Sequence, residues 1–188
     1  MVHLWHDIIP GIKIPTKIHV VIEVPMGSKC KYEIGKTTGA IRVDRVLATA
    51  VRFPQNYGFV PRTLADDGDP IDALVLSQVA FEPGTYVRAK PIGVIHMIDD
   101  KKVDDKLVCV PYGDPKYANY NDLKSLPKNV MDEIEEFFKI YKRLEGKKVK
   151  VKGRSGKLKA YSILKKAIKT YADKYLKKEK KFNKSRKK

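Results

Sequence analysis

Residues 18–24 have the sequence Ile-His-Val-Val-Ile-Glu-Val and lie between Pro15 and Pro25. β-Branched residues suit the pleated surface of a sheet, and prolines mark strand ends, so this stretch predicts a β-strand. Two further strand-like stretches follow it, at residues 29–34 and 40–49, separated by glycines that allow turns. The three stretches together predict an antiparallel meander at the start of the fold.

Three more apolar stretches continue the pattern. They lie at residues 71–79, 86–97 and 106–110, and the first of them follows a Gly-Asp-Pro turn. Each is too short for a firm helix prediction and more typical of a buried strand. Because an antiparallel sheet of this length must hide its edges, the sequence predicts a small closed β-barrel of the OB type.

After Pro111 the spacing of apolar residues becomes helical. The segment from Pro127 to Gly146 places one apolar face on a helix, formed by Val130, Met131, Ile134, Phe137, Phe138, Tyr141 and Leu144. A short strand at 149–152 precedes a second helix, whose predicted face is Tyr161, Leu164, Ile168, Tyr171 and Tyr175. The expected fold class is α+β, a small closed OB-like β-barrel with two C-terminal helices packed against it.

Composition limits the number of domains. The 188-residue chain is 43% hydrophobic, enough for one core and too much for a disordered chain. Its 39 basic and 22 acidic residues give a net charge of +17, and residues 142–188 alone hold 21 basic and 3 acidic side chains. We therefore expect one domain at residues 1–176 and a Lys-rich, flexible tail at 177–188. A collagen-like chain, a disulfide scaffold and a multi-domain enzyme are excluded.

The sequence also favours a compartment. It contains no apolar stretch near the 18 or so residues that a membrane helix needs, and the N-terminus has no signal-peptide pattern. Cys30 and Cys109 are isolated and lack metal-type spacing. We expect a reducing, cytoplasmic setting without membrane partners.

The densest polar cluster is Asp66-Asp67-Gly68-Asp69-Pro70-Ile71-Asp72. Carboxylates this close repel one another unless a cation lies between them. Oxygen donors without Cys or His suit hard cations such as Mg²⁺ or Mn²⁺. A solvated acidic turn is the simpler explanation for this cluster taken alone.

A second acidic cluster favours the metal interpretation. Asp99, Asp100, Asp104 and Asp105 precede Lys106, again next to a predicted strand. Lys31 and Arg45 add cations on or beside other strands. Carboxylates for metal ions, together with Lys and Arg for an anion, are typical of phosphoryl chemistry on a small, highly charged substrate.

At this point the chain resembles the soluble family I inorganic pyrophosphatases, and in particular their short prokaryotic or archaeal members. The resemblance runs from Leu4-Trp5-His6-Asp7 to about Gly153 and is most specific in Asp67-Gly68-Asp69-Pro70-Ile71-Asp72. Further matching segments are Val21–Pro25, Lys31–Glu33, Val43–Arg45, Asn56–Gly58, Pro91–Val94, Asp99–Lys106 and Phe137–Lys142.

The resemblance implies a reaction and a set of residues. The reaction is hydrolysis of inorganic pyrophosphate to two orthophosphates by a water that bridges two metal ions, with several Mg²⁺ ions in the site and Mn²⁺ or other divalent ions as substitutes. Asp69 would be the general base. The implied metal ligands are Asp67, Asp72, Asp99 and Asp104. The implied substrate-binding residues are Lys31, Glu33, Arg45, Tyr57, Lys106, Tyr141 and Lys142, and the implied cavity-lining residues are Glu23 and Asp100. The same resemblance implies a homohexamer.

Three positions depart from the family pattern. Phe53 stands where a Tyr is usual, Asp100 where a Glu is usual, and Arg154 where a Trp is common. None of the three replaces an implied metal ligand or the base. We therefore expect activity to be retained.

A rival function is a nucleic-acid-binding module. OB-type barrels bind nucleic acids, and the basic C-terminal segment would attract a phosphate backbone, an RNA or an acidic partner. Against this, the predicted strands present carboxylates, which repel nucleic acid, instead of exposed aromatic rings.

Overall fold

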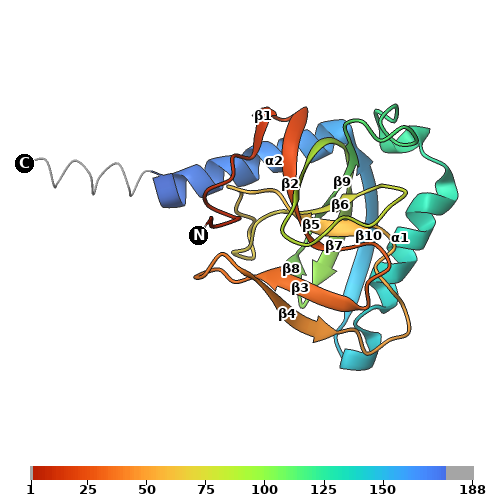
Figure 1. Cartoon of the computed structure of the whole chain (residues 1–188). Coiled ribbons are helices and arrows are strands. Elements are labelled where there is room, and N and C mark those ends of the chain that lie inside the picture. The colour runs from red at the N-terminus through yellow and green to blue at the C-terminus, as the bar shows by residue number, and fades with distance from the viewer. Residues whose placement is uncertain (1, 177–188) are drawn as a thin grey trace, which may run out of the picture.

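The computed structural model describes residues 2–176, so the predicted tail at 177–188 lies outside the described residues. Its main sheet has the strand order β1-β2-β5-β6-β9-β7-β10, with β8 paired to β7 (Figure 1). The strands are β1 (Gly11–Lys13), β2 (Lys17–Val24), β5 (Asn56–Phe59), β6 (Asp72–Val75), β7 (Tyr86–Asp99), β8 (Lys102–Val103), β9 (Lys106–Pro111) and β10 (Val149–Gly156).

Five of these strands are connected in a ring of pairings. The path β2-β5-β6-β9-β7 returns to its start because β7 also pairs with β2, from Ile18 opposite Ala89 to Val21 opposite Tyr86. All of the pairings in the ring are antiparallel except β6–β9, which is parallel. The fold is thus a mixed, sheet-dominated α+β fold, not the purely antiparallel sheet that the sequence suggested.

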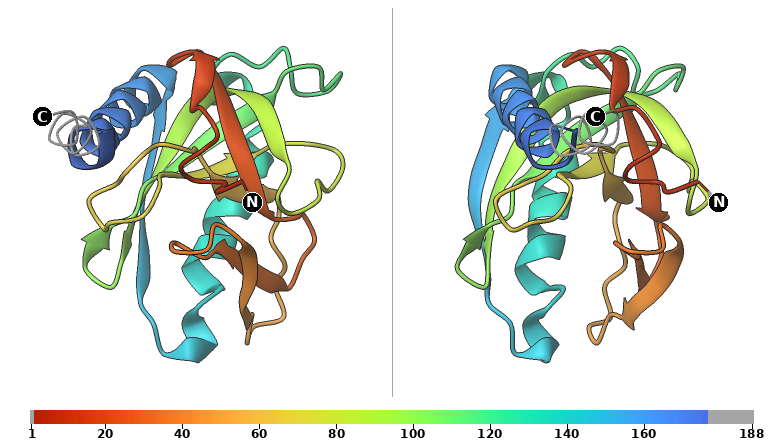
Figure 2. Two further views of the ribbon diagram at one scale, coloured as in Figure 1. Left: turned by 60° about the vertical axis from the view of Figure 1, so that its left-hand side comes forward. Right: turned by 90° about the vertical axis from the view of Figure 1, so that its left-hand side faces the viewer.

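A second, two-stranded sheet holds β3 (Cys30–Ile34) and β4 (Ile41–Val46). The predicted meander is therefore wrong in one respect, because this hairpin does not join the main sheet. The second strand also ends at Val46 instead of Thr49. In both views of Figure 2 the hairpin and α1 (Lys128–Ile140) extend toward the same end of the molecule.

The two helices cover opposite faces of the main sheet. Successive side chains of a strand point to opposite faces, and all of β9 is buried, so each face has its own apolar core. Val108 and Val110 lie in the cluster with Met131 and Phe138 of α1. Leu107 lies in the cluster with Leu164 of α2 (Lys157–Tyr171).

The helix faces differ in part from those predicted. In α1, Met131, Ile134, Phe137 and Phe138 are buried as expected. The short turn η1 (Leu123–Ser125) precedes this helix, which ends at Ile140 and is followed by a second short turn, η2 (Arg143–Glu145). Leu144 is exposed because it lies in η2, beyond the helix. The buried residues of α2 are Ala160, Leu164, Ala167 and Tyr171, so Leu164 and Tyr171 are confirmed. The predicted Ile168 and Tyr175 are partly buried against the core, and Ala160 takes the place predicted for Tyr161. A π-helical turn, η3 (Ala172–Leu176), follows.

No helix within residues 2–176 is long and apolar enough to cross a membrane.

Candidate active site

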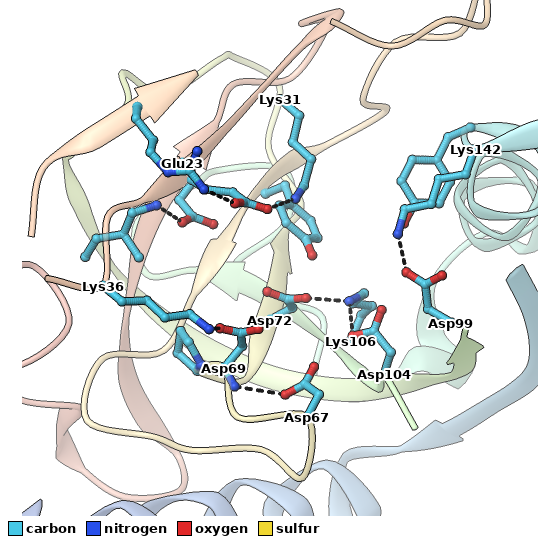
Figure 3. Close-up of a pocket in the computed structure, with 16 residues that line it drawn as sticks. Glu23, Lys31, Lys36, Asp67, Asp69, Asp72, Asp99, Asp104, Lys106 and Lys142 are labelled. Carbon is cyan, nitrogen blue, oxygen red and sulfur yellow. Dashed lines mark hydrogen bonds and ion pairs between the residues drawn. The ribbon is translucent and has the colours of Figure 1, made fainter. Parts of the chain in front are cut away.

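A cavity of about 370 Å³ opens between the hairpin, the start of β6 and the end of α1. Figure 3 shows Asp67, Asp69, Asp72 and Asp104 pointing into a common space, with Lys31 on the hairpin side and Lys142 on the α1 side. The lining residues are Glu23, Lys31, Glu33, Ile34, Lys36, Arg42, Tyr57, Asp67, Asp69, Pro70, Asp72, Asp99, Asp104, Lys106, Tyr141 and Lys142.

The loop before β6 brings three carboxylates to this cavity. Gly68 turns the chain with a φ of +94°, a left-handed conformation that a side chain would strain. The Asp69 backbone N–H donates to Asp67 Oδ1 at 3.0 Å, which closes the turn. Asp72 then begins β6, so the loop and the strand together direct Asp67, Asp69 and Asp72 into one space.

Tyr57 reaches the cavity because β5 lies very close to β2. A Cβ on Gly58 would stand 1.8 Å from the Val21 carbonyl oxygen, so only glycine fits there. The adjacent Tyr57 ring is buried, 5.4 Å from the ring of Phe53. Burial and then the Asp72 carboxylate raise the pKa of Tyr57 well above its usual value. Tyr57 is therefore a neutral hydroxyl at the cavity wall.

Lys106 lies at the centre of the acidic residues. The parallel register of β6 and β9 places Lys106 opposite Asp72, and its ammonium group bonds both Asp72 and Asp104. The side chain is only 3% exposed. Burial alone would lower its pKa, but Asp72 and Asp104 raise it. Lys106 is thus a buried, permanent positive charge between two carboxylates.

Three carboxyl groups in the cavity have raised pKa values, because burial disfavours their ionised forms. Burial, followed by repulsion from Asp72, raises the pKa of Glu23 from 4.5 to about 8, although the Ile34 N–H donates to its Oε1 at 2.7 Å. Burial also raises the pKa of Asp67 and of Asp104, the latter in spite of Lys106. A further positive charge in the cavity would stabilise all three ionised groups.

The end of α1 supplies the opposite wall. Lys142 bonds Asp99 Oδ2, while Asp99 Oδ1 is buried and has no hydrogen-bond partner among residues 2–176. Tyr141 is buried in the α1 core, and burial raises its pKa. Thr49 Oγ1 donates to the Tyr141 carbonyl at 3.3 Å, which fixes this segment against the loop after β4.

The donor set suits divalent metal ions that prefer oxygen. Within the described part of the chain, no three Asp, Glu, His or Cys side chains are already arranged around one point as a metal centre. Four of the acidic residues pair with lysines instead: Lys106 contacts Asp72 and Asp104, Lys142 contacts Asp99, and Lys36 contacts Asp69. These four carboxylates thus already attract cations, and Asp99 Oδ1 is buried without a partner among the described residues, so the oxygen donors fit hard cations.

The two strands of the hairpin contribute two further cations, Lys31 and Arg45. Lys31 contacts Glu33 and lies 3.4 Å from Asp44 Oδ2. Arg45 bonds Asp44 and Glu145, and it lies just outside the set of lining residues. Its Nη2 is buried without a partner among the described residues.

A family profile described as inorganic pyrophosphatase matches residues 20–172, which include every residue that lines the cavity. The chain belongs to the inorganic pyrophosphatase family. The resemblance that the Asp-Gly-Asp-Pro-Ile-Asp motif predicted is therefore confirmed.

Named pyrophosphatases resemble the chain along most of its length. It is 45% identical over 174 residues to soluble inorganic pyrophosphatase 2 of Chlamydomonas reinhardtii, covering 93% of this chain and 91% of the relative. It is 42% identical over 167 residues to the inorganic pyrophosphatase of Picrophilus torridus, covering 89% and 94%. The crystal structure of the Thermus thermophilus inorganic pyrophosphatase superposes with a TM-score of 0.87 at 40% identity, covering 90% of this chain and 99% of that one. These comparisons give no support to the nucleic-acid-binding alternative.

The site of this pyrophosphatase family member differs from the sequence prediction in a few places. Asp100 is exposed at the β7–β8 turn with a φ of 45° and does not line the cavity, so that prediction was wrong. Sequence reasoning missed two lining cations, Lys36, which contacts Asp69, and Arg42, which bonds Glu33 at 3.1 Å. Both follow the Lys-Tyr-Glu segment on the hairpin, and only their position on a hairpin beside the acidic loop could have indicated them.

The other two departures from the family pattern have structural partners. Phe53 packs its ring against Phe137 at 4.9 Å and against Tyr57, so a hydrophobic contact occupies the place of a hydroxyl. Arg154 lies 3.5 Å from Asp132 and 3.6 Å from Glu135, both on α1. Arg154 therefore links β10 to α1 and is remote from the cavity lining.

Proposed function

We propose that the chain hydrolyses inorganic pyrophosphate to two orthophosphate ions in the cavity described above. The observation that carries the proposal is the distribution of charge in one cavity: carboxylates from the loop before β6 face Lys and Tyr side chains from the hairpin, β5 and α1. Family membership supports the same reaction. In that reaction a water oxygen forms a bond to one phosphorus, and the bridging P–O bond breaks with its electron pair leaving on the second phosphate.

The site would use divalent metal ions, and we propose Mg²⁺ as the ion. Several Mg²⁺ ions would be held by Asp67, Asp72, Asp99 and Asp104. Such ions would lower the pKa of bound water and shield the negative charge of the substrate. Glu23 lines the same cavity with a pKa of about 8, so a nearby cation would favour its ionised form.

Asp69 is the proposed general base. It lines the cavity between the other two loop carboxylates, and its backbone N–H is fixed by Asp67. Lys36 contacts one of its oxygens, Oδ1. Asp69 would take a proton from the attacking water as the oxygen–phosphorus bond forms.

The cations and hydroxyls divide between the two phosphate groups. Lys31 and Tyr57 would hold the phosphate under attack, and Glu33 would orient Lys31 through their contact. Arg45, Tyr141 and Lys142 would hold the departing phosphate, with Lys106 close to both. Charge develops on the bridging and terminal oxygens in the transition state, where these fixed cations stabilise it without a covalent intermediate.

We extend the proposal to the barrel, the domain boundaries, the oligomeric state and the compartment. We infer that the ring of five paired strands is the predicted OB-like closed barrel, and that residues 1–176 form one domain with a tail at 177–188. The family resemblance further supports a homohexamer in the cytoplasm. Weak binding of RNA or an acidic partner by the tail stays a separate hypothesis.

Phosphate release from pyrophosphate by the purified protein tests the proposal. With Mg²⁺ present we expect rapid release, loss of release in excess chelator, and weak release from ATP under the same conditions. Folded protein that releases no phosphate with Mg²⁺, Mn²⁺ or Co²⁺ would contradict it.

A further inference from the structure

One ion pair links the hairpin to the segment after α1. Arg45 Nε on β4 donates to Glu145 Oε1 in η2 at 3.0 Å, across 100 residues of sequence. The hairpin forms a sheet of its own and shares no strand pairing with the main sheet. Its position relative to α1 therefore depends on side-chain contacts such as this one.

The hydrogen bonds of the Arg45 guanidinium leave one of its nitrogens, Nη2, without a partner among the described residues. Nε is held by Glu145 and Nη1 by Asp44, on either side of the planar group. Nη2 is buried and has no partner among residues 2–176. A guanidinium carries five N–H donors in a fixed, planar fork, so two carboxylates bonded to Nε and Nη1 fix the plane of the group and the direction of the remaining donors.

Glu145 belongs to the same short segment as two cavity residues. It lies three residues after Lys142 and four after Tyr141, both of which line the cavity. Arg45 and Tyr141 are close enough to interact electrostatically. The side chains of Arg45 and Glu145 are 23% and 16% exposed, so their attraction is screened less than that of a surface pair.

We propose that Glu145 is a positioning residue: it anchors the Arg45 guanidinium to the segment that carries Tyr141 and Lys142, beside the cavity in which a phosphate group would bind. Glu145 itself touches no substrate. The inference rests on the proposed function, because it takes the anion that Arg45 meets to be a phosphate group. The proposed role explains both observations: the Arg45–Glu145 ion pair between distant segments, and the buried Nη2 without a partner among the described residues.

Glu145→Gln is the sharpest test, because the amide keeps the acceptor oxygen and the shape but removes the charge. We expect the KM for magnesium pyrophosphate to rise about ten-fold, the scale of one weakened charge-assisted hydrogen bond, while kcat changes less. Glu145→Asp, which keeps the charge, should recover part of the loss. Glu136→Gln is the matched control, since Glu136 is exposed on α1 and pairs with Lys139.

Calorimetry with imidodiphosphate, a non-hydrolysable analogue, separates this inference from the proposed function. Weaker binding to Glu145→Gln than to Glu136→Gln supports the positioning role even if the wild-type protein releases no phosphate. If the wild-type protein hydrolyses pyrophosphate, and both variants bind the analogue and turn over as it does, the inference is wrong. Thermal unfolding of each variant shows whether a change in binding reflects lost folding.

Discussion

The ionisation of single buried side chains in the cavity depends on neighbouring charges, because solvent hardly reaches them. Lys106 is buried between two carboxylates, whereas Glu23 is buried and repelled by the Asp72 carboxylate. The pKa of Lys106 is raised, so the lysine remains charged at any physiological pH. Glu23 is different, because its pKa of about 8 lies within a range that experiment can reach.

The metal-free protein should therefore lose stability as the pH rises. The pKa of Glu23 is raised from 4.5 to about 8 in the folded protein, so its neutral form stabilises the fold fully below about pH 4.5. That contribution, on the order of a few kcal/mol, is lost as the pH rises to about 8. Urea unfolding in chelator at several pH values should show a steeper decline for the wild type than for Glu23→Gln.

Glu133→Gln is the control for this pH series, because Glu133 is an exposed carboxylate on α1. Its free energy of unfolding should follow the wild-type pH profile. Parallel profiles for Glu23→Gln and the wild type would show that Glu23 does not titrate differently in the folded state.

At the scale of elements, the buried face of α2 contains two alanines that the predicted helix face did not include. Ala160, Leu164 and Ala167 pack in one cluster with Val94 and Leu107 of the sheet, whereas the buried Tyr171 lies in a separate cluster. Leu164 is the largest fully buried side chain that α2 places in the cluster with Val94 and Leu107.

Truncation of two leucines on α2 should have very different effects. Leu164 is 0% exposed and Leu158 is 76% exposed. Leu164→Ala should lower the free energy of unfolding by about 2–5 kcal/mol, because it leaves a cavity in the core. Leu158→Ala should change it by no more than about 0.5 kcal/mol. Urea unfolding of both variants measures the difference, and equal losses would contradict the assigned helix face.

The elements that could be predicted are those with a local apolar pattern. The strand at 18–24 and the helix after Pro127 are confirmed as β2 and α1. The strand β5 was missed because Asn-Tyr-Gly-Phe lacks β-branched residues, and its pairing depends on the close approach of Gly58 to Val21. The strand β10 continues past its predicted end because Gly153, with a φ of +119°, forms a bulge and not a stop.

The site could be predicted where its residues are local in sequence. Asp67, Asp69 and Asp72 come together through one turn, so their spacing indicates them. Lys36 and Glu145 were not predicted, because their contacts with Asp69 and Arg45 join segments that only the folded chain brings together. The residues carried over by resemblance line the cavity apart from Arg45 and Asp100.

At the scale of the whole molecule, a strongly basic chain encloses an acidic cavity. The net charge is +17, yet the pKa values of Glu23, Asp67 and Asp104 are all raised, first by burial. The surplus of positive charge elsewhere in the chain therefore does not satisfy these carboxylates. Divalent cations that bind the folded protein should stabilise it.

Thermal unfolding should show this stabilisation. Mg²⁺ at about 100 times its dissociation constant should add about 2.7 kcal/mol to the free energy of unfolding, whereas NaCl of equal ionic strength should not. Asp72→Asn should reduce the Mg²⁺-dependent increment in Tm. Asp66→Asn should keep it, because Asp66 is exposed and pairs with Lys166 outside the cavity. An equal increment in all three proteins would place the cation elsewhere.

The most direct test of the central claim is the rate of phosphate release by Asp69→Asn, measured beside Asp66→Asn and the wild type at saturating Mg²⁺ and pyrophosphate. A general base contributes about 10²–10⁴-fold, so kcat should fall by that factor in Asp69→Asn. Asp66→Asn should remain close to the wild type, and both variants should keep the Mg²⁺-dependent rise in Tm. A kcat of Asp69→Asn within about five-fold of the wild type would contradict the assignment of Asp69 as the base.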